Sequence, residues 1–217
     1  MKVLITSGGT RVPIDDVRYI GNMSTGRYGA ELARVAYKAG LDVTLFHAKD
    51  SVTPFLSYNY SDEYHEKVYK DYNEYKRVVD LAEDTQPDII ISAAAVSDYI
   101  VDKTEGKISS DGEELIIRLK KAKKILPEFK KVCPNALVVG FKLLVSPKSA
   151  EIKTAVQKVL DNGADLCIFN DLTRIRQGDD TRYIFSHGLK SKPAKDSTTL
   201  INYIIEKYNE RTSRTNG

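Results

Sequence analysis

The sequence has few of the residues that build disulfides, metal cages and membrane spans. Its two cysteines, Cys133 and Cys167, lie far apart in apolar runs, which is typical of buried free thiols. The three histidines are isolated, without the spacing of a metal site. No apolar run approaches the roughly 20 residues that span a bilayer, and no signal peptide opens the chain. We therefore expect a cytoplasmic protein with reduced cysteines, no membrane partner and no protein-held metal.

Several nucleotide and catalytic motifs are missing too. The chain contains no GxGxxG fingerprint, no Walker pattern and no serine–histidine–acid elbow. Its net charge of +3, from 33 basic and 30 acidic residues, is too small to indicate a nucleic-acid partner. Lysine and arginine do gather at residues 118–124 and 130–131. A solvated helical face and a local field for a polyphosphate both remain open for this basic run.

Short apolar runs alternate with helical segments along the chain. This alternation predicts an α/β fold, a Rossmann-like, doubly wound, mostly parallel sheet with helices on both faces. Residues 88–92 are apolar on both faces, as a central parallel strand should be. No linker divides the chain, so we expect one domain over residues 1–210 and a frayed polar tail over 211–217.

The expected elements have the following bounds. Strands are predicted at residues 2–6, 43–46, 88–92, 115–119, 136–140 and 165–169, with an edge strand at 182–185. Helices are predicted at residues 26–38, 78–83, 123–132, 150–162 and 198–210. The tyrosine-rich segment 58–75 is expected to form a short helix with an irregular lead-in.

Ligands of parallel sheets bind at the carboxyl ends of the strands, and glycine-rich and polar loops follow the predicted strands here. Residues 7–10 read Ser-Gly-Gly-Thr, and the two glycines allow the backbone to approach an anion closely. Residues 22–29 read Asn-Met-Ser-Thr-Gly-Arg-Tyr-Gly ahead of a predicted helix, a source of a cap and of backbone donors for a phosphate or carboxylate. Asn22 offers both a donor and an acceptor, which suits an acyl intermediate. An ordinary turn and an ordinary capped helix remain open.

A second group of loops follows the predicted central strands. Residues 93–99 read Ala-Ala-Ala-Val-Ser-Asp-Tyr, where small side chains leave room for a base or sugar. Asp98 can meet a hydroxyl or a Mg²⁺-bound water, and Lys107 can neutralise charge on a transferring α-phosphate. Phe141 follows the next strand, where it either stacks on a base or joins the core. A capping aspartate and a solvated lysine are the plain alternatives.

Taken in order, these motifs resemble phosphopantothenoylcysteine synthetase, the ligase half of the bifunctional coenzyme A biosynthesis flavoprotein. Each piece is weak alone, but the ordered set is specific and spans nearly the whole chain, which resembles the free-standing form. The matching pieces are Ser-Gly-Gly-Thr-Arg-Val-Pro-Ile-Asp-Asp-Val-Arg at 7–18, Asn-Met-Ser-Thr-Gly at 22–26, Ala-Ala-Ala-Val-Ser-Asp-Tyr at 93–99, Gly-Lys-Ile-Ser at 106–109, Gly-Phe-Lys-Leu-Leu at 140–144, Ala-Asp-Leu at 164–166 and Asn-Asp at 170–171.

The resemblance implies a two-step reaction. In that family the carboxylate of 4'-phosphopantothenate attacks the α-phosphate of CTP, or of ATP in some members, with Mg²⁺, giving an acyl-nucleotidylate and pyrophosphate. The amine of cysteine then displaces the nucleotide to form an amide. The resemblance also implies a homodimer, for which residues 178–187 are a candidate contact, and no flavin.

The resemblance assigns roles position by position. The expected catalytic residues are Asn22, Lys107 and Arg18, and the expected substrate-binding residues are Asn22, Ser24, Thr25 and Gly26. The expected nucleotide-binding residues are Gly8, Gly9, Ala94, Ala95, Asp98, Lys107, Phe141, Lys123, Lys124 and Lys158. Residues 107–110 carry one lysine where the bifunctional form often has several, so Lys123 and Lys124 are expected to supply the missing charge. CTP is favoured over ATP, and these departures leave the preference open.

Two other classes stay open. A nucleotide sensor, or another carboxylate-activating ligase on the same fold, would keep the strand-end loops without using Asn22 and Lys107 together. An NAD(P)-linked reductase is disfavoured because the glycine fingerprint is absent.

Overall fold

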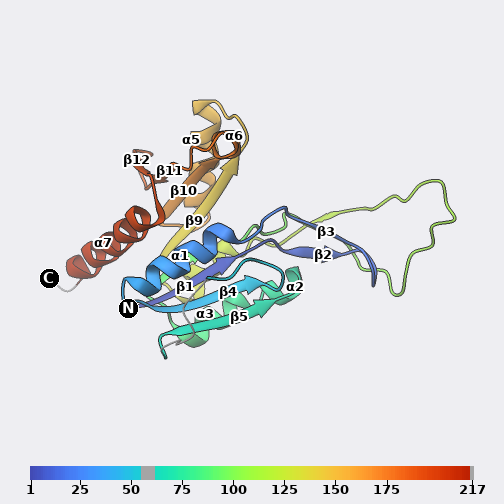
Figure 1. Cartoon of the computed structure of the whole chain (residues 1–217), viewed down its shortest axis with the longest axis horizontal. Coiled ribbons are helices and arrows are strands. Elements are labelled where there is room, and N and C mark those ends of the chain that lie inside the picture. The colour runs from blue at the N-terminus through green and yellow to red at the C-terminus, as the bar shows by residue number, and fades with distance from the viewer. Residues whose placement is uncertain (55–61, 216–217) are drawn as a thin grey trace.

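The computed structural model describes residues 1–54 and 62–215 and is built on one eight-stranded sheet (Figure 1). The strand order is β12-β11-β10-β9-β6-β1-β4-β5. All pairs from β5 to β10 are parallel, and only β11 and β12 run antiparallel to their neighbours. The predicted doubly wound, mostly parallel sheet is therefore confirmed. The chain runs outward from β1 in both directions, which places a topological switch point beside β1.

The element bounds are as follows. The sheet consists of β1 (Lys2–Ser7), β4 (Asp42–Ala48), β5 (Tyr64–Tyr69), β6 (Ile89–Ser92), β9 (Leu137–Leu144), β10 (Leu166–Asp171), β11 (Arg182–Phe185) and β12 (Ser191–Ala194). The helices are α1 (Arg27–Lys38), α2 (Tyr72–Tyr75), α3 (Val78–Thr85), α4 (Leu126–Val132), α5 (Ser149–Asp161), α6 (Leu172–Arg176) and α7 (Ser197–Thr215).

Alternation along the strands divides the core between the two faces of the sheet. Val3 and Ile5 of β1 pack with α1 and α7, whereas Leu4 packs on the other face with α3 and α4. A separate cluster joins α5 to β10 and β11. Each fully buried Val, Leu or Ile side chain contributes about 1.5–3 kcal/mol relative to exposure. Helices thus cover both faces of the sheet, and the loops at the strand ends remain available to form a site.

Helix α1 begins close to the end of β1. Gly26 is its N-cap residue, with φ 75° and no side chain to cap the helix, and the predicted polar segment contributes through Thr25 Oγ1, which accepts from Arg27 N at 3.4 Å. Ser7 Oγ donates to Gly26 O at 2.9 Å, and a Cβ at Gly29 would lie 2.6 Å from Ser7 Cβ. The two glycines therefore let α1 pack tightly on β1.

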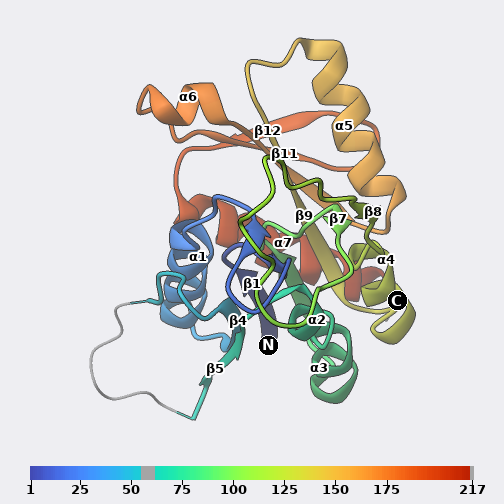
Figure 2. The same cartoon turned by 90° about the vertical axis from the view of Figure 1, so that its right-hand side faces the viewer.

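A long excursion of the chain projects from the body beyond the carboxyl ends of the strands. We call residues 99–121 the arm; its base is the short pair β7 (Tyr99–Ile100) and β8 (Lys120–Lys121). The arm extends to the right in Figure 1 and toward the viewer in Figure 2, beside the hairpin β2 (Arg11–Pro13) and β3 (Tyr19–Gly21). The predicted strand at residues 115–119 is wrong, since these residues lie in the arm without strand pairing.

Other predicted elements also need correction. Residues 64–69 form the edge strand β5, and within the described part of segment 58–75 only residues 72–75 are helical; residues 58–61 lie outside the described residues. The edge assignment of residues 182–185 is wrong, because β12 covers β11. Residues 182–185 thus belong to the sheet, and α7 continues past residue 210 to Thr215. Within the described ranges no helix is long and apolar enough to cross a membrane.

Candidate functional site

The glycine loop after β1 is joined to the alanine loop after β6. Ala95 N donates to Gly8 O at 2.8 Å, and Thr10 N donates to Ala95 O at 3.0 Å. A Cβ at Gly9 would lie 2.6 Å from Asn22 O, so glycine is required here for contact with the loop ahead of α1. Two predicted loops, some 85 residues apart in the chain, thus share one rim of the sheet.

Asn22 lies on this joined rim. Its side-chain Nδ2 donates to Ala95 O at 2.7 Å, and the residue is otherwise exposed. Ser24 N donates to Asn22 O at 2.9 Å, which fixes the turn into α1. The structure therefore brings the predicted substrate loop against the predicted base-binding alanines, with the Asn22 amide between them.

Arg18 is held by a buried carboxylate. The Asp15 side chain is fully buried and accepts from Arg18 Nε at 2.9 Å and from the backbone N–H of Ile108 at 3.1 Å. Arg18 Nη2 donates to Ile108 O at 2.6 Å. Burial alone would raise the pKa of the Asp15 carboxyl, but hydrogen bonds from the Arg18 side chain and from three backbone N–H groups outweigh it and hold the pKa well below its usual range. We call Asp15, Arg18 and Ile108 the clamp.

A second set of contacts fixes the other side of Lys107. Asp16 N donates to Gly106 O, and Gly106 N donates to an Asp16 carboxylate oxygen, both at 2.9 Å. Lys103 also pairs with the Asp16 carboxylate. Lys107 therefore stands between two residues whose backbones are tied to the turn at residues 14–18, with its own side chain exposed.

The basic run before α4 contributes its two lysines differently. Lys124 pairs with the Asp98 carboxylate, and Ala122 N donates to Asp98 O at 2.9 Å. Lys123 instead pairs with Glu128 at 3.1 Å. Of the two lysines expected to supply charge, Lys124 lies beside a predicted nucleotide contact, and Lys123 is directed to a helix carboxylate.

Phe141 lies one residue beyond Gly140, which is level with the end of β6 through the Ser92 pairing. Its ring is partly buried and packs edge-on against Tyr28 of α1, with ring centroids 6.0 Å apart. A Cβ at Gly140 would lie 2.6 Å from Val159 Cγ1, so α5 packs closely on β9, and the predicted contact Lys158 lies in the last turn of that helix.

Asn170, the penultimate residue of β10, has an unpaired polar atom. Its side-chain Oδ1 is buried and has no hydrogen-bond partner in the described part of the chain. Buried polar atoms are rarely left unpaired, so Asn170 is a further candidate for ligand contact. Two sequence signals pointed to it, its place after a predicted strand and the Asn-Asp motif at residues 170–171, and neither assigned it a role.

A cavity of about 250 Å³ opens next to Asn22, on the β4 side of the glycine loop. Arg11 crosses it, pairing with Asp50 at 2.6 Å and stacking over the Tyr19 ring at 4.5 Å. The cavity is lined by Gly9, Arg11, Tyr19, Gly21, Asn22, Met23, Ser24, Ala48, Lys49, Asp50, Ser51 and Lys70.

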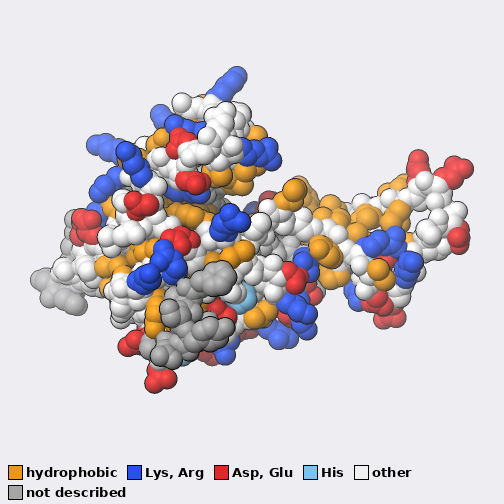
Figure 3. Space-filling view, in the orientation of Figure 1, with side chains coloured by type: hydrophobic (Ala, Val, Ile, Leu, Met, Phe, Trp, Pro, Cys, Tyr) orange, Lys and Arg blue, Asp and Glu red, His pale blue; other side chains and the backbone are white. Residues whose placement is uncertain are grey.

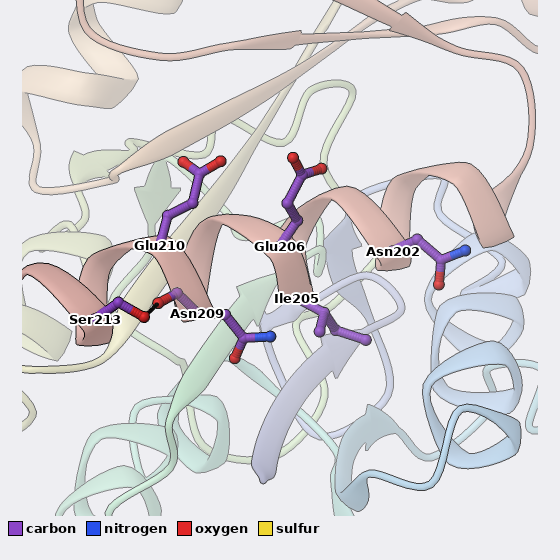
Figure 4. A pocket seen from close by; sticks show the side chains of 6 residues that line it. All are labelled: Asn202, Ile205, Glu206, Asn209, Glu210 and Ser213. Carbon is purple, nitrogen blue, oxygen red and sulfur yellow. Dashed lines mark hydrogen bonds between the residues drawn. The ribbon is translucent and has the colours of Figure 1, made fainter.

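A larger hollow of about 790 Å³ runs along α7 and is unrelated to the strand ends (Figure 4). All six side chains that line it come from this one helix, and Glu206 and Glu210 give it acidic character. It has no converging loops, so it is a surface trough rather than a reaction site.

The remaining reactive groups do not suggest covalent or metal chemistry. Burial raises the pKa of the Cys167 thiol to about 12, which makes it a poor nucleophile. Among residues 1–54 and 62–215, no cluster of three His, Cys, Asp or Glu side chains could hold a metal. Tyr72 and Lys76 have the Tyr-x-x-x-Lys spacing of reductases, but the Tyr72 hydroxyl donates to Lys123 O at 2.9 Å within a buried contact.

Comparison with known proteins agrees with the motifs. A family model described as the DNA/pantothenate metabolism flavoprotein C-terminal domain matches residues 1–198. The coenzyme A biosynthesis bifunctional protein CoaBC of Methanocaldococcus jannaschii is 36% identical over 180 residues, which cover 82% of this chain and 42% of that protein. The Vibrio cholerae protein of the same name is 32% identical, with 82% and 43% covered. The chain thus spans less than half the length of the curated relatives that it matches.

Solved structures show the same fold. The DNA/pantothenate metabolism flavoprotein from Streptococcus pneumoniae superposes with a TM-score of 0.81 at 26% identity, covering 97% of this chain and 99% of that one. The Cab2 H337A mutant in complex with phosphopantothenate-cysteine gives a TM-score of 0.85 at 22% identity, covering 100% and 89%. The resemblance drawn from the loop motifs is confirmed.

Proposed function

The chain belongs to the DNA/pantothenate metabolism flavoprotein C-terminal domain family, and from this we propose that it joins cysteine to 4'-phosphopantothenate at the expense of a nucleoside triphosphate. One observation carries the proposal most directly. Asn22 Nδ2 donates to Ala95 O, and the residues on both sides of Lys107 are bonded to the turn at residues 14–18 of the β2–β3 hairpin, whose second strand leads directly to Asn22. A nucleotide sensor would keep the strand-end loops without using these two residues together.

In the first step, a carboxylate oxygen of the acid bonds to the α-phosphorus of the nucleotide, and the bond from that phosphorus to the β-phosphate oxygen breaks, releasing pyrophosphate. The substrates supply the nucleophile and the leaving group, so the protein aligns them and offsets charge. Alignment can contribute about 7–11 kcal/mol. Lys107 is the exposed cation that we assign to the α-phosphate, and the clamp positions its backbone.

In the second step, the cysteine amine bonds to the acyl carbon, the bond from that carbon to the nucleotide oxygen breaks, and the amine loses a proton. We propose that Asn22 contacts the acyl-nucleotidylate, because its amide lies between the predicted substrate loop at residues 22–26 and the alanine loop after β6. A carboxamide can donate to an acyl oxygen while remaining uncharged.

We propose further nucleotide contacts along the same rim of the sheet. Ala94 and Ala95 leave space beside the backbone, Phe141 follows the residue that pairs with the end of β6, and Lys124 pairs with Asp98. Lys158, in the last turn of α5, is proposed as a contact from the family resemblance. The exposed Asp98 carboxylate suits Mg²⁺ carried by the nucleotide, which would screen the phosphate charges. We favour CTP over ATP as co-substrate.

A pyrophosphate-release assay tests the proposal. Purified protein is mixed with phosphopantothenate, Mg²⁺ and either CTP or ATP, with and without cysteine. We expect sustained release that depends on both the acid and cysteine, with CTP the better nucleotide. Nucleotide binding without cysteine-dependent turnover would instead favour a sensor, and binding of NADPH would favour a reductase.

We further propose that the protein acts as a homodimer in the cytoplasm, without flavin, nucleic acid or membrane partners. Apolar side chains remain exposed on the arm and on the β2–β3 hairpin (Figure 3), namely Val17, Tyr19, Ile20, Tyr99, Leu115, Ile116 and Leu119. A concentration of exposed apolar side chains on a projecting element is typical of an interaction surface.

A further inference from the structure

Arg182, the first residue of β11, is a buried arginine whose charge is only partly paired. It is 7% exposed, although arginine is almost never buried unless it is paired. Its Nη1 donates to Asp180 O at 2.6 Å, and its Nη2 lies 3.3 Å from the largely exposed Asp180 carboxylate. Of the four buried side-chain atoms that lack a hydrogen-bond partner among the described residues, three belong to Tyr28, Asn170 and Arg182, and the arginine atom is Nε. A buried unpaired donor is costly, so Arg182 does more than fill space.

Strand alternation places Arg182 on the same face of the sheet as Phe141. Ile168 of β10 pairs with Phe141 in β9 and with Ile184 in β11, and all three side chains pack into the core that α1 and α7 cover. Arg182 precedes Ile184 by two residues, and Asn170 follows Ile168 by two residues. Both therefore face this same core.

Tyr28, in the first turn of α1, contacts both Arg182 and Phe141. The guanidinium carbon of Arg182 lies 4.6 Å from the centroid of the Tyr28 ring. The Tyr28 and Phe141 rings pack edge to face, with centroids 6.0 Å apart. A cation over an aromatic face is attracted more strongly when it is desolvated, and edge-to-face packing is a preferred geometry of aromatic pairs. The three side chains form a continuous row, which we call the stack.

Phe141, at one end of the stack, is one of the residues that we propose contact the nucleotide. It is only partly buried at the edge of the core. A ring in this position is free to change its side-chain torsions unless neighbouring side chains hold it. Tyr28 is one such neighbour, and Arg182 in turn holds the Tyr28 ring.

We propose that Arg182, acting through Tyr28, positions Phe141 for the nucleotide, so that nucleotide affinity depends on a guanidinium that does not itself contact the ligand. The inference rests on the proposed function, which assigns Phe141 to the nucleotide. Tyr28 and Arg182 are positioning residues here and not catalytic ones. This role accounts for the burial of an arginine with an unpaired Nε, since an apolar side chain would fill the same space without that cost.

Kinetic constants and direct titration of the full chain with CTP and with ATP test this role. Tyr28→Leu removes the ring, and Arg182→Met removes the charge from an unbranched side chain. We expect each change to raise the KM and the Kd of the nucleotide by about three- to tenfold, as loss of an aromatic or cation–π contact does. The KM of phosphopantothenate should stay unchanged. Tyr28→Phe and Arg182→Lys keep the stacking groups and should retain most of the affinity.

A double-mutant cycle shows whether the effect passes through Phe141. Phe141→Leu alone should weaken nucleotide binding. Adding Tyr28→Leu or Arg182→Met to it should weaken binding little further, because changes to residues in contact are not additive when they act through one another. A merely structural role of Tyr28 and Arg182 would give additive losses instead.

Two control variants separate positioning from general destabilisation. Ile184→Val trims a buried side chain on the same face of β11, two residues from Arg182, and should lower Tm without changing the nucleotide Kd. Lys192→Met removes a cation that lies 4.7 Å from the Tyr203 ring centroid, on the outermost strand β12. It should leave the nucleotide Kd unchanged.

Two results would overturn the assignment. One is an unchanged nucleotide Kd in folded Tyr28→Leu and Arg182→Met, and the other is additive losses in the cycle with Phe141→Leu. If Arg182→Met does not fold, the comparison of Tyr28→Leu with Tyr28→Phe decides in its place. If wild type releases no pyrophosphate with any nucleotide, the proposed function fails, and the titrations then test the stack alone. Weaker nucleotide binding by Tyr28→Leu than by Tyr28→Phe would support the stack, and equal binding would reject it.

Discussion

Lys107 stands between Gly106 and Ile108, whose backbones are both bonded to the turn at residues 14–18. We predict that Lys107→Ala slows acid-dependent pyrophosphate release by about 10²–10³-fold, because loss of one aligned electrostatic donor costs on the order of 3–4 kcal/mol. The side chain is exposed, so the fold should survive, as thermal unfolding can verify. Lys121→Ala, on β8 of the arm, is the matched control. A near-wild-type rate would remove Lys107 from the reaction.

Substitution of Asn22 should affect the two reaction steps differently. We predict that Asn22→Asp still forms the acyl-nucleotidylate but releases product slowly, because a carboxylate cannot donate to Ala95 O, to which the Asn22 amide donates at 2.7 Å. Quenched samples analysed for the intermediate and for the amide product measure the two steps separately. Normal product formation by this variant would show that Asn22 has no role in catalysis.

Asp15 holds the loop that carries Lys107, so its substitution should affect the first reaction step. We predict that Asp15→Asn loosens residues 103–108 and slows activation, while conversion of preformed acyl-nucleotidylate by cysteine stays near the wild-type rate. Hydrogen exchange of this loop is the structural readout. A variant that loses both steps equally, or one with a protected loop, would contradict a positioning role.

The pH dependence of the clamp has a definite sign. The pKa of the folded Asp15 carboxyl lies below 3.8, the value expected without the clamp. Its stabilising contribution is therefore complete above the unfolded pKa and is lost as pH falls below about 4 toward the folded pKa. The protection factors of the loop amides in wild type should fall only in acid, whereas those in Asp15→Asn should be low at every pH.

Sequence patterns identified some of these residues and missed others for physical reasons. Asn22 and Lys107 belong to short motifs whose residue types already indicate acyl and phosphate contacts. Asp15 belongs to the same motif as Arg18, but an aspartate beside a turn is usually solvated, and its burial depends on a loop about 90 residues away. Long-range contacts of this kind leave no local signal.

At the scale of elements, the junction of β1 and α1 depends on glycine. We predict that Gly29→Ala lowers stability by roughly 1–3 kcal/mol through overpacking, because its Cβ would lie 2.6 Å from Ser7 Cβ. For a chain of this size, each kcal/mol lowers Tm by about 2–4 °C. Gly112→Ala is the control, since the nearest atom there is 3.5 Å away. Equal Tm values for the two variants would show that α1 can shift without cost.

Strands and helices were predicted correctly where burial gives a recognisable pattern of apolar residues in the sequence. Strands β1, β6, β9 and β10 are buried on both faces and read as continuous apolar runs. The edge strands do not, since β5 buries only its first and last residues and β12 contains Pro193. Residues 115–119 have the composition of a strand, yet in the arm they find no neighbouring strand to pair with.

At the scale of the whole molecule, the arm is a part whose apolar side chains stay exposed to solvent in a single copy of the chain. It projects away from the core (Figure 1) and exposes apolar side chains, with Ile116 78% exposed. The arm also carries Lys107, so a partner that covers the arm lies close to this proposed catalytic residue. Dimerisation would therefore both bury apolar surface and influence catalysis. A single variant that disrupts the dimer can test both effects.

We predict that Ile116→Glu yields monomers, because burying a charge in an apolar contact is unfavourable, and that pyrophosphate release falls together with the dimer fraction. Sedimentation equilibrium over a range of concentrations measures the assembly state. Val68→Glu is the control, since Val68 is 52% exposed on β5, outside the arm. Monomeric wild type, or equal effects of the two variants, would contradict dimerisation through the arm. Dimeric Val68→Glu beside monomeric, inactive Ile116→Glu would show that the arm joins two copies and that the site depends on their union.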